Sequence, residues 1–342
     1  MPVPRHDADA TVAAVGEHAL IERIRARAGV LPDWVTLGIG DDAAVLEPER
    51  GTLDVVTTDS LVERVHFRRD WTLPAAVGHK ALAVSLSDLA AMGAAPRASL
   101  LSLALPPDVP LAEFDGLVDG FLALAAKTGA PLVGGNITRS PGPLVVDVTA
   151  IGSVRRRRLL TRGGGRPGDE LFLTGELGGA AAGLALLEAS RDRATFDALD
   201  TDCVHHYEWP DPRLRCGQIV AHSRAASACV DLSDGLADAA GQLARASQTG
   251  VVVDAAAVPI HPGAAAWAAR TGGETLPLAL VGGEDYELLF AVSPRHRRKF
   301  LAAARACRGL VLTSVGRLRS EPGQWLSRMG QLEPLGSGFV HF

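Results

Sequence analysis

Several residue types are scarce in this chain of 342 residues. It contains only four cysteines, which is too few for a disulfide framework, so we expect a reduced, cytoplasmic protein. Acidic residues (39) outnumber lysine plus arginine (34), and the formal net charge of −5 argues against nucleic acid as a partner. Neither an uncharged apolar run of about 18 residues nor a signal-peptide core is present, so we expect no membrane segment.

The length and the composition allow two globular domains. Hydrophobic residues make up 47% of the chain, enough for a large core. Predicted strands and helices alternate in both halves, which favours an α/β (α+β) fold. We expect residues 132–135 and 144–152 to be paired strands. The Arg-rich segment 155–168 marks a break in composition and predicts domains at 1–155 and 156–342.

The familiar nucleotide-binding motifs are missing. Residues 38–43 (GIGDDA) match a dinucleotide fingerprint, but no helix follows them, and two carboxylates would repel a pyrophosphate. The segment 163–169 lacks the Lys and the Ser/Thr of a P-loop, and no protein-kinase motif occurs. Any phosphate site must therefore use other residues.

Aspartates instead cluster at the ends of apolar runs. They occur in GDD (40–42), TTD (57–59), SD (87–88) and DLSDG (231–235). A lone aspartate is most often a helix N-cap or a turn residue, and Asp234 before Gly235 fits an ordinary N-cap. Asp88 is harder to explain in this way, because it interrupts an apolar helix and aspartate is rarely buried unpaired.

Convergence of these carboxylates would require cations. Two like charges 4 Å apart repel by roughly 4 kcal/mol at an effective dielectric constant of 20. Mg²⁺ takes carboxylate, hydroxyl and carbonyl oxygens and shares phosphate oxygens with a substrate, so the pattern predicts a phosphoryl-transfer site. Zinc is less suitable, because Cys203, His205, His206 and Cys216 form no recognised ligand spacing.

Several ordered motifs together resemble one known family. They are GIGDDAAVL (38–46), TTDSLVERVHF (57–67), KALAVSLSDLAAMGA (80–94), LTRGGGRPGDELFLTG (160–175), PDPR (210–213), VDLSDGL (230–236), GGEDYELLF (282–290) and the terminal HF (341–342). From about residue 15 to the end, the chain resembles thiamine-monophosphate kinases, members of the aminoimidazole ribonucleotide synthetase-like (PurM-like) superfamily. The resemblance implies ATP-dependent phosphorylation of thiamine monophosphate to thiamine diphosphate, with several Mg²⁺ ions.

The resemblance also implies a fold and a set of site residues. We expect a PurM-like fold, with an N-terminal ATP- and metal-binding domain whose mixed sheet forms a homodimer, a C-terminal α/β domain, and the active site in the cleft between them. The implied metal ligands are Asp42, Thr57, Thr58, Asp59, Asp88, Asn136, Asp231 and Asp234, of which Asp42, Asp59 and Asp88 are the expected catalytic residues. The implied ATP contacts are Gly135, Asn136, Arg162 and Ser233, and the implied substrate contacts are His66, Glu284 and Phe339.

Two positions depart from the family pattern. Asn136 stands where the family usually has aspartate, which keeps an oxygen ligand but removes a charge. Near the C-terminus, Gly336 and Ser337 replace a usual aromatic, and Phe339 is the nearest substitute. The alternatives are therefore another PurM-like ATP-dependent enzyme, or a non-catalytic protein that binds nucleotide or thiamine phosphate.

Overall fold

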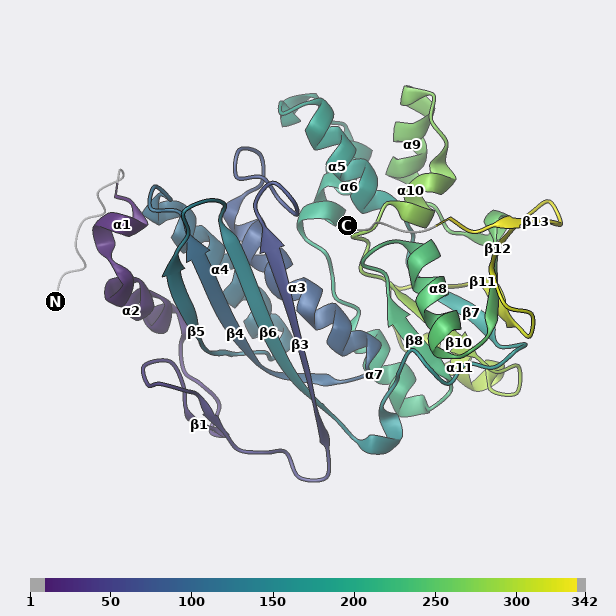
Figure 1. Cartoon of the computed structure of the whole chain (residues 1–342), viewed down its shortest axis with the longest axis horizontal. Helices are drawn as coiled ribbons and strands as arrows, with labels where there is room; N and C mark the ends of the chain where they lie inside the picture. The colour runs from purple at the N-terminus through teal and green to yellow at the C-terminus, as the bar shows by residue number, and fades with distance from the viewer. Residues whose placement is uncertain (1–9, 337–342) are drawn as a thin grey trace. The chain divides into compact units, whose positions relative to one another are not determined.

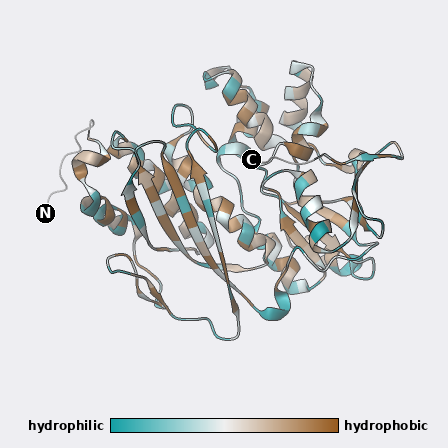
Figure 2. Ribbon diagram, viewed as in Figure 1, coloured by the Kyte–Doolittle hydropathy of each residue, from teal (hydrophilic) through white to brown (hydrophobic). Residues whose placement is uncertain are grey.

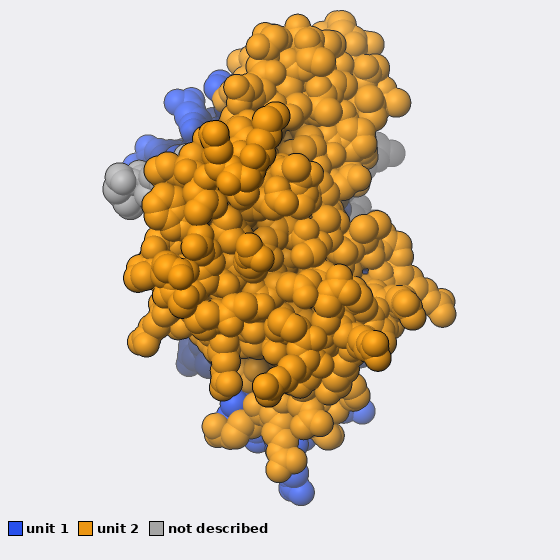
Figure 3. Space-filling view, turned by 90° about the vertical axis from the view of Figure 1, so that its right-hand side faces the viewer, with its two compact units in different colours: residues 1–85, 96–153 blue, residues 86–95, 154–342 orange. Residues whose placement is uncertain are grey.

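The computed structural model describes residues 10–336 and divides the chain into two compact units (Figures 1 and 3). Unit 1 comprises residues 1–85 and 96–153, and unit 2 comprises residues 86–95 and 154–342. Helix α3 (Pro74–Ala91) contributes its first part to unit 1 and its last six residues to unit 2. The mixture of helices and sheets in both units confirms the α/β (α+β) class.

Unit 1 is built on a four-stranded sheet with the order β3-β6-β4-β5. The strands are β3 (Leu53–Val62), β4 (Ala95–Leu105), β5 (Leu132–Arg139) and β6 (Val145–Val154). Strand β5 pairs in parallel with β4, whereas β6 lies between β3 and β4. The predicted pairing of 132–135 with 144–152 is therefore wrong: both strands exist, but β4 separates them.

Helices α3 and α4 (Leu111–Thr128) lie behind this sheet in the view of Figure 1. They cross at close range because glycines leave room for the neighbouring backbone: a Cβ on Gly120 would lie 1.9 Å from the carbonyl oxygen of Ala75, and one on Gly78 would lie 1.8 Å from that of Leu117. The other face of the sheet is uncovered within the unit, where Val56 is 63% exposed. Hydrophobic and hydrophilic residues alternate along these strands in Figure 2.

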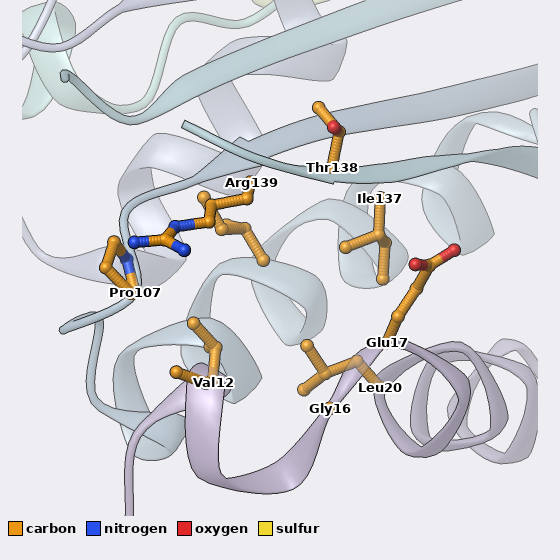
Figure 4. A pocket seen from close by; sticks show the side chains of 10 residues that line it. Val12, Gly16, Glu17, Leu20, Pro107, Ile137, Thr138 and Arg139 are labelled. Carbon is orange, nitrogen blue, oxygen red and sulfur yellow. The ribbon is translucent and has the colours of Figure 1, made fainter. Parts of the chain in front are cut away.

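The remaining elements of unit 1 are two short helices and a small hairpin. Helices α1 (Val12–Val15) and α2 (Glu17–Ala28) are separated by Gly16, whose φ of 82° interrupts the helical path. Strands β1 (Val35–Leu37) and β2 (Val45–Leu46) form a small antiparallel hairpin. A pocket of about 410 Å³ lies between α1, α2 and β5, with Glu17, Ile137 and Arg139 in its wall (Figure 4).

Unit 2 contains a seven-stranded sheet with the order β13-β12-β9-β11-β7-β10-β8. The strands are β7 (Glu170–Thr174), β8 (Ala228–Asp231), β9 (Gly250–Asp254), β10 (Leu288–Val292), β11 (Leu312–Arg319), β12 (Gln324–Arg328) and β13 (Gln331–Pro334). The helices are α5 (Gly179–Ala189), α6 (Ala198–Glu208), α7 (Leu214–Ser223), α8 (Leu236–Ala246), α9 (Pro262–Thr271), α10 (Thr275–Val281) and α11 (Arg297–Ala304). Strand β8 is an edge strand, and it ends at Asp231.

Side chains from both faces of this sheet are buried. Because side chains alternate along a strand, Leu171 and Leu173 of β7 enter a core with α8, while Phe172 points the opposite way. The Phe172 ring packs against Phe300 of α11, with centroids 4.8 Å apart. The four cysteines are free and buried. Across residues 10–336, the helices are too short or too polar to cross a membrane.

The close crossing of α3 and α4 predicts a position-specific effect of alanine. Gly120→Ala places a methyl group against the backbone of Ala75, so we expect a loss of about 1–3 kcal/mol in the free energy of unfolding. Gly116→Ala is the matched control one turn earlier: its Cβ would meet Pro74 Cβ at 3.1 Å, and helix propensity offsets that crowding by about 1 kcal/mol. Urea unfolding measures both, and equal effects would contradict the proposed packing.

Candidate active site

Strand β3 places Thr57 and Asp59 on one face of the unit 1 sheet. Residues two apart on a strand share a face, and Asp59 lies on the side of α3, where Ser85 Oγ donates a hydrogen bond to Asp59 Oδ2 (2.9 Å). Thr58 points to the uncovered face, and its Oγ1 donates to Asp147 Oδ1 of β6 (3.2 Å). The Thr58 hydroxyl is therefore turned away from Asp59.

Gly135 and Asn136 lie on the opposite edge of the same sheet. A Cβ on Gly135 would be 1.8 Å from the carbonyl oxygen of Leu101, so only glycine fits there. Asn136 pairs with Ser102 and is exposed. Strands β6 and β4 separate β5 from β3, and at the usual strand spacing this places Asn136 about 14 Å from the Thr57–Asp59 strand. Asn136 and Asp59 cannot be ligands of the same ion in this arrangement.

His66 and Asp42 lie in loops of unit 1. His66 Nδ1 accepts a hydrogen bond from the backbone N–H of Val62 (3.1 Å), so the neutral ring has its proton on Nε2. The buried Lys80 of α3 donates from Nζ to the carbonyl oxygen of His66 (3.4 Å). Asp42 is exposed just before β2, and its backbone N–H donates to Asp41 Oδ1 (2.8 Å).

Asp231 forms the acidic centre of unit 2. It is 7% exposed at the end of β8, and Ser87 Oγ of α3 donates to its Oδ2 (2.9 Å). Burial and the nearby negative charge of Asp88 raise the pKa of Asp231 to about 7, against the opposing effect of Arg162. Asp88, Arg162 and Asp231 are therefore within electrostatic reach of one another. Two carboxylates in such a place favour a bound cation.

A second loop carries the remaining predicted residues of unit 2. Gly235, not Asp234, is the N-cap of α8, and no side chain caps that helix. Asp234 Oδ2 instead accepts a hydrogen bond from Ser233 Oγ (2.9 Å), so the N-cap interpretation of Asp234 is wrong. The backbone N–H of Glu284 donates to the carbonyl oxygen of Ser233 (2.6 Å). Glu284 and the DLSDG turn are therefore neighbours.

The backbone around Glu284 is strained. Glu284 has a φ of 62° and Tyr286 a φ of 48°, values that non-glycine residues seldom adopt. A hydrogen bond from the Tyr286 N–H to the carbonyl oxygen of Leu232 (3.0 Å) holds the segment in place. Backbone strain of this kind is typical of functional loops, because the surrounding structure must compensate for it.

Two buried acids, Asp285 and Glu287, anchor this loop through hydrogen bonds. Asp285 accepts hydrogen bonds from the N–H groups of Gly178 (2.8 Å) and Ala180 (3.2 Å) at the start of α5, and burial raises its pKa to about 7 in spite of these bonds. Glu287 accepts two hydrogen bonds from Arg213, one of them from Nε (2.8 Å). Burial alone would lower the pKa of Arg213, but the charge of Glu287 raises it.

The residues that position the acids were not predicted from the sequence. Ser85 and Ser87 each donate to a predicted carboxylate, and two serines spaced by two in an apolar helix were the available signal. Asp285 and Glu287 interrupt an apolar run in the same way. The pocket of Figure 4 contains none of the predicted site residues. Phe339 lies outside the described residues.

Comparison with known proteins places the chain in a class. The family model for the N-terminal domain of AIR synthase related proteins matches residues 40–154, and the model for their C-terminal domain matches residues 166–324. The fold and these two matches define an AIR synthase related protein.

Individual relatives identify the family within this class. The thiamine-monophosphate kinase of Escherichia coli K12 is 39% identical over 335 residues, which cover 96% of this chain and 99% of the relative. The crystal structure of the Stenotrophomonas maltophilia K279a thiamine-monophosphate kinase has a TM-score of 0.80 and 38% identity, over 90% of this chain and 95% of that one. The chain belongs to the thiamine-monophosphate kinase family.

A solved complex adds the ligands of one neighbour. The structure of AaThiL complexed with AMPPCP and TMP has a TM-score of 0.76 and 29% identity to this chain, and covers 96% of this chain and 97% of that one. These similarities confirm the family predicted from the motifs and its PurM-like two-domain fold.

Proposed function

We propose that this chain transfers the γ-phosphoryl group of ATP to thiamine monophosphate, giving thiamine diphosphate and ADP. The observation that carries this function is the 39% identity to a thiamine-monophosphate kinase over nearly the whole chain. The neighbour solved with AMPPCP and TMP supports the two substrates. The strained Glu284 loop and the paired acids of unit 2 are features common at functional sites, and they also support the proposal.

The acids fit Mg²⁺ by the chemistry of their donors. In both units the predicted ligands offer oxygen, and Ser85 and Ser87 hold two of the carboxylates, Asp59 and Asp231, in place. We propose Asp42, Thr57, Thr58, Asp59, Asp88, Asn136, Asp231 and Asp234 as the ligands. Thr58 would take part through its backbone carbonyl oxygen, because its hydroxyl is turned away from Asp59. Asn136 would serve a different ion from Asp59, because two strands separate them. When bound, Mg²⁺ neutralises phosphate charge.

The acceptor supplies its own nucleophile. A phosphate monoester has a second pKa of about 6, so near neutral pH its oxygen is already an anion and needs no general base. That oxygen forms a bond to the γ-phosphorus as the bond to the β–γ bridging oxygen breaks, and ADP leaves with the bonding electrons. The transfer is direct and in line, with no phospho-enzyme. The task of the protein is to bring two anions together.

We propose the substrate contacts that the family resemblance implies. His66 has its proton on Nε2 and can donate it to a phosphate oxygen. Glu284 provides a negative charge for the cationic thiazolium ring. Arg162 is exposed and free of a helix or strand, which suits a contact with ATP phosphates. Gly135, Asn136 and Ser233 complete the proposed ATP contacts, and Phe339 stays a prediction for the thiamine ring.

The oligomeric state and the cellular location are also proposals. A homodimer through the unit 1 sheet would cover the exposed face that includes Val56. The domain division at 155/156 and the cytoplasmic location stay predictions from the sequence. The alternative of a non-catalytic binding protein draws on Asn136, which removes one charge from the predicted ligand set.

Release of ADP tests the proposed function. With ATP, Mg²⁺ and thiamine monophosphate, we expect turnover that yields thiamine diphosphate and stops when EDTA removes the metal. Parallel reactions contain free thiamine or aminoimidazole precursors, and we expect no ADP above background in them. Turnover with free thiamine but not with its monophosphate would overturn the assigned substrate. Binding of thiamine monophosphate without turnover would favour the non-catalytic alternative.

Asp59→Asn tests the metal role of β3. Loss of this charge should lower kcat/KM for thiamine monophosphate by at least about 100-fold, as for removal of one preorganised charge-stabilising group. Asp54→Asn, an exposed acid on the same strand, is the matched control and should retain wild-type activity. Circular dichroism checks that both variants are folded. Near-normal activity of Asp59→Asn would remove Asp59 from the metal site.

Asn136→Asp tests the departure from the family pattern. An added carboxylate strengthens binding of a hard cation, so the Mg²⁺ concentration for half-maximal activity should fall about threefold or more. Asn136→Ala should raise the same concentration, because it removes the oxygen ligand. Magnesium titrations at saturating ATP measure both. Identical magnesium dependence in all three proteins would show that position 136 contacts no metal.

A further inference from the structure

Three potential metal ligands meet in unit 2, and none of them is among the carboxylates proposed to bind Mg²⁺. Asp202 and His206 lie four residues apart on α6, so they share one face of that helix. His261 precedes α9. One ligand atom from each side chain lies within 4.8 Å of the other two. From these contacts we propose that Asp202, His206 and His261 bind a divalent transition-metal ion of the zinc type.

His261 is the fixed member of this cluster. It is 3% exposed, its Nδ1 accepts a hydrogen bond from the backbone N–H of Gly263 (3.2 Å), and its Nε2 lies 3.1 Å from Asp202 Oδ2. By themselves, these bonds describe a histidine that caps α9 and is oriented by an aspartate. The position of His206 beside this ring is not explained by helix capping.

His206 is half-buried against His261, with ring centroids 4.6 Å apart in an edge-on arrangement. Within residues 10–336, no hydrogen bond is made by the His206 side chain. A polar ring in this position would gain a partner from a bound cation. The two imidazoles also approach Gly179 at the start of α5, where a Cβ would lie 3.1 Å from His261 Cγ and 3.4 Å from His206 Cγ.

Two imidazoles and one carboxylate are a common ligand set for Zn²⁺, with water in the fourth position. In a tetrahedral site with bonds of about 2.0–2.1 Å, ligand atoms lie roughly 3.4 Å apart. The contact between His261 Nε2 and Asp202 Oδ2 is already this short. The longer separations, up to 4.8 Å, need a rotation of side chains, and the Asp202 side chain is 53% exposed and has room to move.

Metal binding at His261 Nε2 requires a change of tautomer in that ring. In the structure Nδ1 accepts from Gly263, so the ring proton is on Nε2 and faces Asp202. Binding of a metal at Nε2 requires this proton to move to Nδ1, where Cys203 Sγ lies 3.6 Å away as an acceptor. No proton leaves the ring in this exchange. Gly263 loses its acceptor, which weakens the site relative to a fully prepared one.

The test uses untagged protein in excess Mg²⁺, so that the oxygen sites are occupied and no engineered histidines compete. Isothermal titration with Zn²⁺ should show one saturable site with a dissociation constant below about 10 µM. Co²⁺ in place of Zn²⁺ should give the visible absorption of a tetrahedral site with nitrogen ligands, and Zn²⁺ should raise Tm.

Three variants locate the site. Asp202→Asn and His206→Asn should each weaken Zn²⁺ binding at least about tenfold and abolish the cobalt absorption. His205→Asn changes an exposed histidine on the same helix and should bind like the wild type. Tm without metal checks that each variant is folded. Absence of a saturable site, or equal affinity in wild-type protein and His206→Asn, would overturn the proposal.

Discussion

Repulsion between carboxylates is the constraint on which the site depends. Burial and the charge of Asp88 raise the pKa of Asp231, and Arg162 only partly offsets this effect. Helix α3 provides the local answer, because Ser87 donates to Asp231 and Ser85 donates to Asp59. Each hydroxyl fixes one carboxylate oxygen and orients the other. These contacts would lower the reorganisation needed to bind the proposed Mg²⁺ ions.

Much of the fold was predictable from the periodicity of apolar residues. Where a prediction from periodicity was wrong, the structure shows the reason. Leu82, Leu86, Leu89 and Ala90 form an apolar stripe that predicts a helix over 75–92, and helix α3 occupies 74–91. This periodicity is a local property of the sequence. Apolar residues spaced through 11–29 also predict one helix there, but the structure divides it at Gly16, whose positive φ interrupts the helical path. The neighbours of β5 and β6 were not predictable, because strand order depends on contacts between segments far apart in the chain.

The residues of the site were predictable from local motifs, but their arrangement in space was not. Motifs identified the acids, but not the directions of their side chains: Thr58 points away from Asp59, and Asp234 does not cap α8. Spacing could relate Asp202 to His206, four residues apart on one helix, but not to His261, which is 55 residues beyond His206 and joins it only through tertiary packing. Ligands brought together by a fold leave no local pattern.

The left-handed backbone at Glu284 has an energetic implication. Glycine at this position would relieve about 1 kcal/mol of strain, so selection for stability alone would favour it over any residue with a side chain. The chain instead retains a carboxylate there, supported by the buried Asp285 and the Arg213–Glu287 pair. Under the proposed substrate contact, the strain at Glu284 is the cost of placing a carboxylate there, and the hydrogen bonds of Asp285 and Glu287 compensate for it.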